Sequence, residues 1–190
     1  MRIILASQSP RRQELLRKAG YKLAVCPAHF EEIGNIVNNA KEVVSVNAKG
    51  KCMEIVRQMG DEIPVLGADT VVVLDGEIIG KPKDAADAKV TLKHLSGRKH
   101  DVLTGMVIAY RGEILSKVSK TEMYFKKLTD EQIDRYVATG KPLDKAGSYG
   151  IQDDDGFMID HFVGSYDNVI GLDVMAVDNM LKELKVGQND

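Results

Sequence analysis

The stretch IPVLGADTVVVLDGEIIGKP, residues 63–82, contains two apolar runs separated by a tight turn. The first run is rich in β-branched residues, and the Asp-Gly pair at 75–76 favours a two-residue turn between antiparallel strands. The stretch therefore predicts a β-hairpin. If the turn has two residues, Thr70 faces Lys81 across the hairpin, which brings a cation next to the step from Asp69 to Thr70.

Strands and helices alternate on both sides of this hairpin, as expected for an α/β protein with a mixed sheet. Neither an internal repeat nor a linker-like tract divides the chain, so residues 1–190 are predicted to form a single domain. The predicted strands are RIILA, YKLAVCP, HDVLTGMVIAY, GEILSKVSKTEMYF and two strand-like segments after DDDG. The predicted helices are residues 10–19, 40–58 (apolar face Val43, Val44, Val46 and Ile55, weakened by Gly50), 84–96, 129–139 and a last one around VMAVDNMLKELK.

Composition excludes several classes of function. The net charge is −2 and only 5% of the residues are aromatic, which provides neither the basic surface nor the stacking groups of a nucleic-acid-binding module. No apolar run approaches the roughly 20 residues of a membrane span, and the N-terminal segment is too short and too early charged for a signal peptide. We therefore expect a cytoplasmic protein with no membrane partner, in which Cys26 and Cys52 stay reduced.

LASQSPRR, residues 5–12, places two arginines where a helix begins. Ser9 suits the N-cap and Pro10 the first helical position, so Arg11 and Arg12 fall in the first turn. The helix dipole disfavours each cation there by up to about 1 kcal/mol. A phosphate group would satisfy the helix N–H groups and both guanidiniums together. The alternative is that both arginines are solvated or pair with local carboxylates.

Asp69 lies inside a strand that otherwise reads as buried. An ionised carboxylate there costs several kcal/mol unless it is paired, hydrogen-bonded or metal-bound, so Asp69 is either a satisfied structural group or a functional one. We favour a functional group. Strict alternation places Asp69 on the face opposite to Thr70, so Gly80 or a bulge would have to re-aim Lys81 towards it.

Two other polar segments differ in what they indicate. DKAGSYGIQ, which ends at Gln152, combines charge and small residues without a regular period, which is typical of a site loop. The acids at 153–155 fail the spacing of a calcium loop and favour a turn. Walker A and dinucleotide-binding glycine patterns are absent from the sequence, which argues against both classes of nucleotide-binding protein.

Five separated segments together resemble one family, the Maf-like nucleoside triphosphate pyrophosphatases, once described as septum formation inhibitors. They are LASQSPRRQELL, GADT followed by a hairpin and GKP, LSGRKHDVLTG, LDKAGSYGIQ and GSYDNVIGL, in the family's order between residues 5 and 172. A single segment is weak, but five in order are specific.

The resemblance implies a metal-dependent hydrolase that cuts a nucleotide between the α- and β-phosphates, giving a nucleoside monophosphate and pyrophosphate with Mg²⁺ or Mn²⁺. The implied fold is an elongated mixed β-sheet with flanking helices, forming two lobes around a cleft, similar to the inosine triphosphate pyrophosphatases. The family also suggests a homodimer and a role in cell division through a protein partner.

Each motif position of the family carries an implied role in this sequence. Ser7, Arg11 and Arg12 match the phosphate-binding loop, Glu32 an acidic residue of the cleft, and Lys51 and Lys81 its basic residues. Asp69 matches the proposed general base, and together with Glu32 it would hold the metal. Arg12, Thr70 and Gln152 match positions of the branch that resembles dTTP and UTP pyrophosphatases, with modified pyrimidine nucleotides as further candidates.

Two alternatives and two departures accompany this assignment. The protein could instead be a nucleotide-binding regulator of cell division, or a pyrophosphatase of another base preference such as 7-methylguanosine triphosphate. The chain has Asp173 where the family commonly has proline after GL, and it has acids at 153–155 where small residues are expected. Both departures lie in segments that could border the nucleotide.

Overall fold

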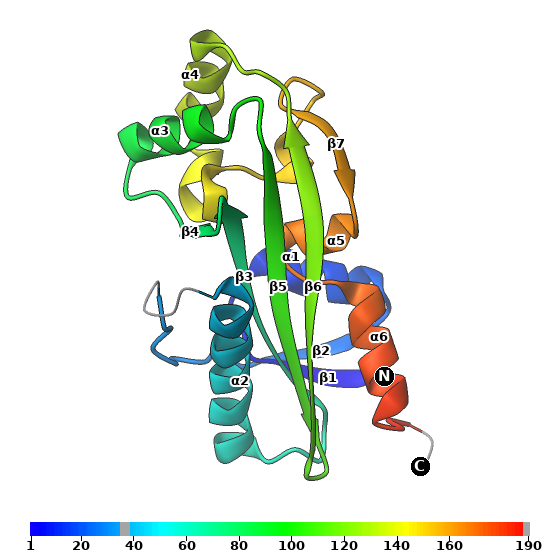
Figure 1. Cartoon of the computed structure of the whole chain (residues 1–190). Helices are drawn as coiled ribbons and strands as arrows, with labels where there is room; N and C mark the ends of the chain where they lie inside the picture. The colour runs from blue at the N-terminus through cyan, green and yellow to red at the C-terminus, as the bar shows by residue number, and fades with distance from the viewer. Residues whose placement is uncertain (35–38, 188–190) are drawn as a thin grey trace.

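The computed structural model describes residues 1–34 and 39–187 of the chain, in which strands and helices form an elongated α/β fold (Figure 1). The strands are β1 (Arg2–Leu5), β2 (Lys22–Val25), β3 (Val65–Leu74), β4 (Glu77–Ile79), β5 (Lys99–Tyr110), β6 (Glu113–Phe125) and β7 (Ile159–Val163). The helices are α1 (Pro10–Lys18), α2 (Ala40–Met59), α3 (Ala85–Leu95), α4 (Asp130–Ala138), α5 (Tyr166–Ile170) and α6 (Val174–Glu183), with short 3₁₀ turns η1 (Lys141–Asp144), η2 (Ala146–Ser148) and η3 (Ile151–Asp153). None of these helices has the length and apolarity needed to cross a membrane.

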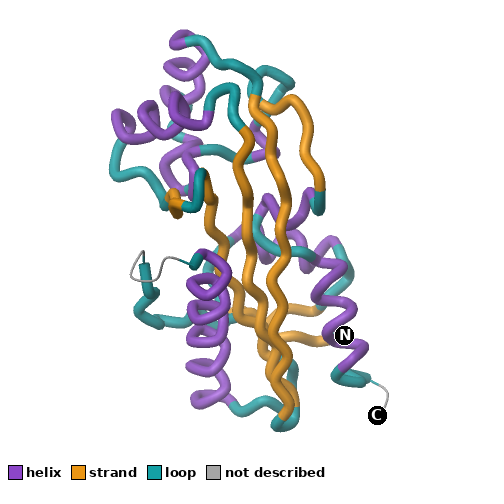
Figure 2. Tube along the Cα trace, in the orientation of Figure 1, coloured by secondary structure: helices purple, strands orange, loops and turns teal. Residues whose placement is uncertain are grey.

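The strands of the described chain form one mixed sheet in the order β2-β1-β3-β5-β6-β7, with β4 beside β3. β1 runs parallel to both β2 and β3, and the remaining pairs are antiparallel. The long strands β5 and β6 run the length of the molecule and join its two ends (Figure 2). The α/β class with an elongated mixed sheet, predicted from the sequence, is confirmed.

The predicted hairpin is present, but its second strand is short. Val72 pairs with Ile79 and Leu74 with Glu77, and the two turn residues have φ values of 52° and 87°. Only glycine and a few polar residues adopt this left-handed region readily, which explains the Asp-Gly pair. Because β4 ends two residues before Lys81, the predicted pairing of Thr70 with Lys81 lies outside the observed ladder.

The edge of β3 that faces away from β5 is open in its middle. β1 pairs with β3 only at Val65 and Leu66, and β4 pairs with it only from Val72 to Leu74. In the described chain, no strand covers residues 67–71 on that edge, although β5 pairs with them on the other. The gap holds the Asp69–Thr70 step between two lobes. The lower lobe contains β1, β2, α1 and α6, and the upper lobe contains β4, α3 and α4 (Figure 1).

Helices cover the two faces of the sheet unequally. α2 lies against one face, where Gly67 and Gly105 permit close contact: an added Cβ would meet the Ala48 carbonyl oxygen at 2.2 Å and that of Val44 at 2.4 Å. On the other face, α1 and α6 enclose a lower core, and α3 and α4 enclose an upper core (Figure 1). Asp69 faces α2, and Thr70 faces the side on which the two cores meet.

Some details of the helices differ from the sequence predictions. Gly50 does not interrupt α2; an added Cβ would lie 2.3 Å from the ring of Phe30, so glycine makes room for the preceding loop. Val46 was expected on the apolar face but is 39% exposed. One of the two strand-like segments is instead the short helix α5, which Ser165 caps by accepting a hydrogen bond from the Asn168 amide.

Both departures from the family pattern have structural roles. Asp173 is the N-cap of α6: its carboxylate accepts hydrogen bonds from the Ala176 amide at 3.2 Å and the Ser119 hydroxyl at 2.7 Å. Asp153 accepts a hydrogen bond from the Tyr136 hydroxyl at 3.0 Å, and Asp154 accepts hydrogen bonds from the backbone amides of Met158 and of Ile159, the first residue of β7. The acids at 153–155 therefore include turn-forming residues, as predicted. Cys26 and Cys52 are both free thiols.

His100 is buried in the upper core, where its ring contacts Phe125 and Tyr149 edge-to-face. Its Nε2 shares a hydrogen bond of 2.7 Å with the Tyr149 hydroxyl. Burial lowers the pKa of His100 from 6.5 to about 4, because the charged imidazolium loses its hydration there.

Acid is therefore expected to destabilise the fold through His100. Between pH 6.5 and about 4 the unfolded chain binds a proton at this residue and the folded chain does not, so the free energy of unfolding falls as the pH falls. The full loss is about 3 kcal/mol. Urea unfolding across this pH range should show a shallower slope for His100→Gln than for the exposed control His94→Gln. Equal slopes would contradict the role of His100.

Candidate functional site

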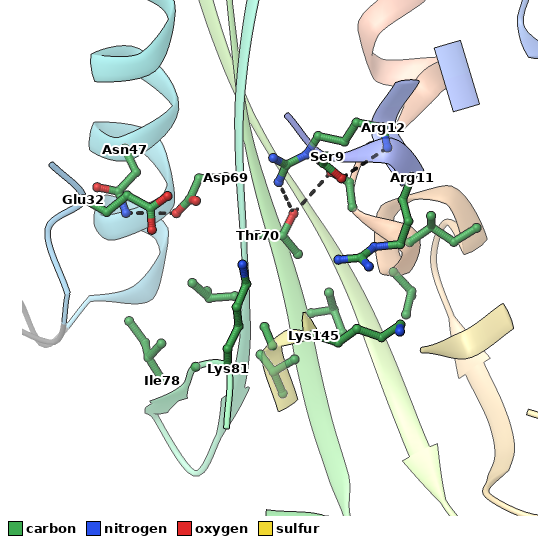
Figure 3. Close-up of a pocket in the computed structure, with 18 of the residues that line it drawn as sticks. Ser9, Arg11, Arg12, Glu32, Asn47, Asp69, Thr70, Ile78, Lys81 and Lys145 are labelled. Carbon is green, nitrogen blue, oxygen red and sulfur yellow. Dashed lines mark hydrogen bonds between the residues drawn. The ribbon is translucent and has the colours of Figure 1, made fainter. Parts of the chain in front are cut away.

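A pocket of about 530 Å³ opens at the uncovered edge of β3, between the two lobes. Its wall comes from both faces of the sheet, because Asp69 and Thr70 point to opposite sides of the strand and both line it (Figure 3). No bulge is needed to bring Lys81 near Asp69, because the gap in the edge of β3 opens both faces of the strand to the same cavity. Around the gap lie the start of α1, one side of α2, the segment after β4 and the loop from η1 to η3.

On the α2 side, Asp69 is only 6% exposed, and each of its two carboxylate oxygens is hydrogen-bonded to a side chain of α2. Its Oδ1 accepts a hydrogen bond from Lys51 Nζ at 2.8 Å, and its Oδ2 accepts one from Asn47 Nδ2 at 2.9 Å. Lys51 also pairs with Glu32 Oε1 at 2.5 Å, so one ammonium lies between two carboxylates. These contacts offset the cost of burying the Asp69 charge.

On the other side of the pocket, Arg12 is only 9% exposed. Its guanidinium donates hydrogen bonds to three acceptors, and none of them carries a charge. Nε donates to the Gly171 carbonyl at 2.8 Å, Nη1 to Ser7 Oγ at 3.1 Å and Nη2 to Thr70 Oγ1 at 3.0 Å. Burial lowers the pKa of Arg12, and the negative charge of Asp69 opposes that effect. A guanidinium has five N–H groups, so two remain for a ligand after these bonds within the described chain.

The predicted start of α1 is confirmed. Ser9 is the N-cap and accepts a hydrogen bond from the Arg12 amide at 3.4 Å, with Pro10 at the first helical position. Arg11 forms an ion pair with Asp144 of η1 at 2.6 Å, so its carboxylate partner comes from a segment 133 positions away and not from the local sequence. The pair links α1 to the loop of the upper lobe, and Arg11 still lines the pocket.

Lys81 and Gln152 also line the pocket, and both residues are exposed. Figure 3 shows the Lys81 side chain extending towards the gap between Asp69 and Thr70. The short β4 therefore leaves Lys81 free to extend along the cleft rather than across the hairpin. Every predicted site residue except Ser7 borders the pocket directly, and Ser7 contacts it through Arg12.

Among the charged and amide side chains of the pocket, two were not predicted from the sequence. Lys145 donates to Asp144 Oδ1 at 2.9 Å and to the Lys141 carbonyl at 2.6 Å, and its place in the DKAGSYGIQ segment was the available signal. Asn47 precedes Lys51 by four positions on α2, which places both side chains on one helix face. That spacing becomes informative only once the face is known to cover Asp69.

The two carboxylates of the pocket suit a small divalent cation that is also coordinated by oxygen atoms of a bound ligand. The described chain contains no group of three or more histidine, cysteine or acidic side chains arranged so that they could hold a metal ion by themselves. Mg²⁺ is commonly held by one or two carboxylates together with water and phosphate oxygens, rather than by an all-protein cage. Glu32 and Asp69, which already share a cation in Lys51, provide two such carboxylates.

The pocket thus separates two kinds of chemistry. Carboxylates lie on the α2 side, whereas Arg11, Arg12 and Lys145 lie on the other side and Lys81 reaches between them. Apolar side chains border the second group, among them Val72, Val102, Val169, Ile170 and Tyr149. The arrangement can bind a polyanion along the gap and place an apolar or aromatic group beside its cationic end.

Comparisons with known proteins give consistent results. A sequence model of the Maf-like protein family matches residues 2–184. A dTTP/UTP pyrophosphatase of Bacillus cytotoxicus is 41% identical over 98% of this chain and 97% of that protein, and one of Alkaliphilus metalliredigens is 40% identical over 95% and 94%. A HAM1 protein structure from Coxiella burnetii covers 96% of this chain and 99% of its own, with a TM-score of 0.52 and 18% identity, which shows a shared fold.

Proposed function

The chain belongs to the Maf-like protein family, and from this membership we propose that it hydrolyses dTTP and UTP to the nucleoside monophosphate and pyrophosphate. The observation that carries the proposal is the cleft at the open edge of β3. There Asp69 and its carboxylate neighbour Glu32 face one half of the cavity, and several cations border the other half. The relatives at 40–41% identity are named for the same activity.

The triphosphate is assigned to the cationic groups. Arg11 and Arg12 lie at the N-terminus of α1, where the helix dipole and guanidiniums together favour phosphate oxygens. Lys81 and Lys51 extend the positive charge towards Asp69. Ser7 contributes through Arg12, whose guanidinium it orients.

Glu32 and Asp69 are the residues that would hold Mg²⁺ or Mn²⁺, together with phosphate oxygens of the substrate. When bound, such a cation neutralises the phosphate charge and polarises the bond that breaks. Lys51 lies between the same two carboxylates and keeps them close together.

Asp69 is assigned as the general base. Each of its oxygens accepts one hydrogen bond from Asn47 or Lys51 and retains a lone pair for a water molecule. As the water oxygen bonds to phosphorus at the α–β anhydride, Asp69 accepts its proton and the phosphorus–oxygen bond of the anhydride breaks. The nearby cations stabilise the pyrophosphate that leaves.

Base preference is assigned to Gln152, Thr70 and Arg12. Thymine and uracil present an acceptor at O4 next to a donor at N3, and the Gln152 amide can both donate and accept. Cytosine reverses this pattern, so it would leave the amide badly paired. The family also leads us to propose a cytoplasmic homodimer.

A nucleotide panel tests the proposed function. With Mg²⁺ or Mn²⁺, the purified chain should release pyrophosphate from dTTP and UTP with a kcat/KM at least about 10-fold above that for dCTP, dGTP and 7-methylguanosine triphosphate. Preference for 7-methylguanosine triphosphate would contradict the assigned base preference. Turnover of no nucleotide above background would contradict the activity itself and would favour the regulatory alternative.

A further inference from the structure

Asn47 is a buried polar residue of α2 whose amide oxygen and both amide hydrogens are hydrogen-bonded. It is 2% exposed, and it faces the middle of β3. Its Oδ1 accepts a hydrogen bond from the Ile33 amide at 2.9 Å, and its Nδ2 donates to the Ile33 carbonyl at 3.2 Å and to Asp69 Oδ2 at 2.9 Å. One side chain therefore connects the loop before α2 to the acid of the site.

The hydrogen bonds fix which way the amide points. The Ile33 N–H needs an acceptor, so it must face Oδ1, and this places the two hydrogens of Nδ2 towards the Ile33 carbonyl and Asp69. Because an amide is neutral, Asn47 restrains the Asp69 carboxylate without cancelling its charge. Lys51 holds the other oxygen, so both oxygens of Asp69 have fixed positions.

The contact to Ile33 acts on the second acid of the site. Ile33 follows Glu32 directly, and both of its backbone polar groups are bound by Asn47. Asn47 thereby holds the backbone beside Glu32 at the distance at which Glu32 and Asp69 share Lys51. With so little exposed surface, Asn47 has almost no area for direct contact with a substrate.

We propose that Asn47 is a positioning residue that fixes the Asp69 carboxylate and the Glu32 loop relative to each other, an inference that rests on the proposed pyrophosphatase function. Replacing Asn47 leaves the residues that contact phosphate and base in place, so the loss of activity should appear as a lower kcat rather than as a higher KM. Supporting partners of this kind typically change activity 10- to 100-fold when they are replaced.

Two substitutions test the assignment. Asn47→Asp keeps the shape and the acceptor for the Ile33 amide but replaces the donor to Asp69 by a like charge, and Asn47→Leu removes all three hydrogen bonds. Both should lower kcat for dTTP by about 10- to 100-fold with KM within about threefold. The control is Lys49→Ala, an exposed position on the same helix, with thermal unfolding measured for every variant.

A double-mutant cycle separates positioning from a general structural role. Adding Asn47→Leu to Asp69→Asn should lower the residual single-turnover rate by clearly less than Asn47→Leu lowers it in the wild-type protein, because the part of the loss that acts through Asp69 overlaps. A full additional 10- to 100-fold loss would overturn the proposal. The proposal would also be overturned if Asn47→Asp had a near-normal kcat while the wild-type protein releases pyrophosphate from dTTP. If the wild type itself releases none, the proposed function fails first and this inference fails with it.

Discussion

Asp69→Asn is expected to lower kcat for dTTP by about 10²- to 10⁴-fold, the range that a positioned general base contributes. The amide keeps the shape of the carboxylate but cannot accept a proton from water. Steady-state kinetics should show the loss in both kcat and kcat/KM, and the affinity for a non-hydrolysable dTTP analogue, measured by calorimetry, should change by less than about 10-fold. Lys51 keeps its second carboxylate partner in Glu32, so the fold should remain intact.

The matched control is Asp134→Asn, which removes an exposed ion pair with Lys89 on the surface of the upper lobe. That pair contributes at most about 1 kcal/mol to stability, so the control should keep wild-type kinetics. An Asp69→Asn variant with a kcat within about threefold of the wild type would contradict the assignment of Asp69 as the base.

Arg12→Lys is expected to lower kcat/KM for dTTP by about 100-fold and to change the ranking of nucleotides. Lysine keeps the charge but lacks the planar fork, so it cannot bind Ser7, Thr70 and the Gly171 carbonyl at once. One lost charge-assisted hydrogen bond is worth about 1.5–3 kcal/mol, which corresponds to the expected fold-change. Rates for dTTP, UTP and dCTP measured side by side give the result.

The control for Arg12 is Arg17→Ala, on the same helix, where the side chain is exposed and bonds only to Gln13 in the described chain. It should leave both rate and preference unchanged. Equal losses for all three nucleotides in Arg12→Lys would show that Arg12 grips phosphate alone and has no part in the choice of base.

Local signals made much of the fold predictable. The Asp-Gly turn, the Ser9 N-cap and the capping box formed by Thr129 and Gln132 each depend on residues within four positions of one another, and all three are present. The short helix α5 was mistaken for a strand because its few residues cannot show a helical period. Its local helix signals are the cap Ser165, the acid Asp167 in the first turn and Gly171 at the end.

Without the family resemblance, which supplied residues such as Glu32, Lys51 and Gln152, the site was predictable only where one residue already looked anomalous. Asp69 stood out as an acid in a buried strand, and Arg11 and Arg12 as cations at a helix start. Asn47 carries no such anomaly, because its role depends on how α2 packs against β3. The ion pair between Arg11 and Asp144 spans 133 positions, and the gap in the β3 edge results from where two other strands end. Such long-range features follow from the tertiary structure.

The position of bond cleavage is the central claim, and product analysis tests it most directly. When the wild-type protein is incubated with dTTP and Mg²⁺, ³¹P NMR should show dTMP and pyrophosphate appearing together in equal amounts, with no dTDP at early times. Formation of dTDP and orthophosphate as the first products would contradict the account, because it would place the reaction at the γ-phosphate rather than at the α–β anhydride.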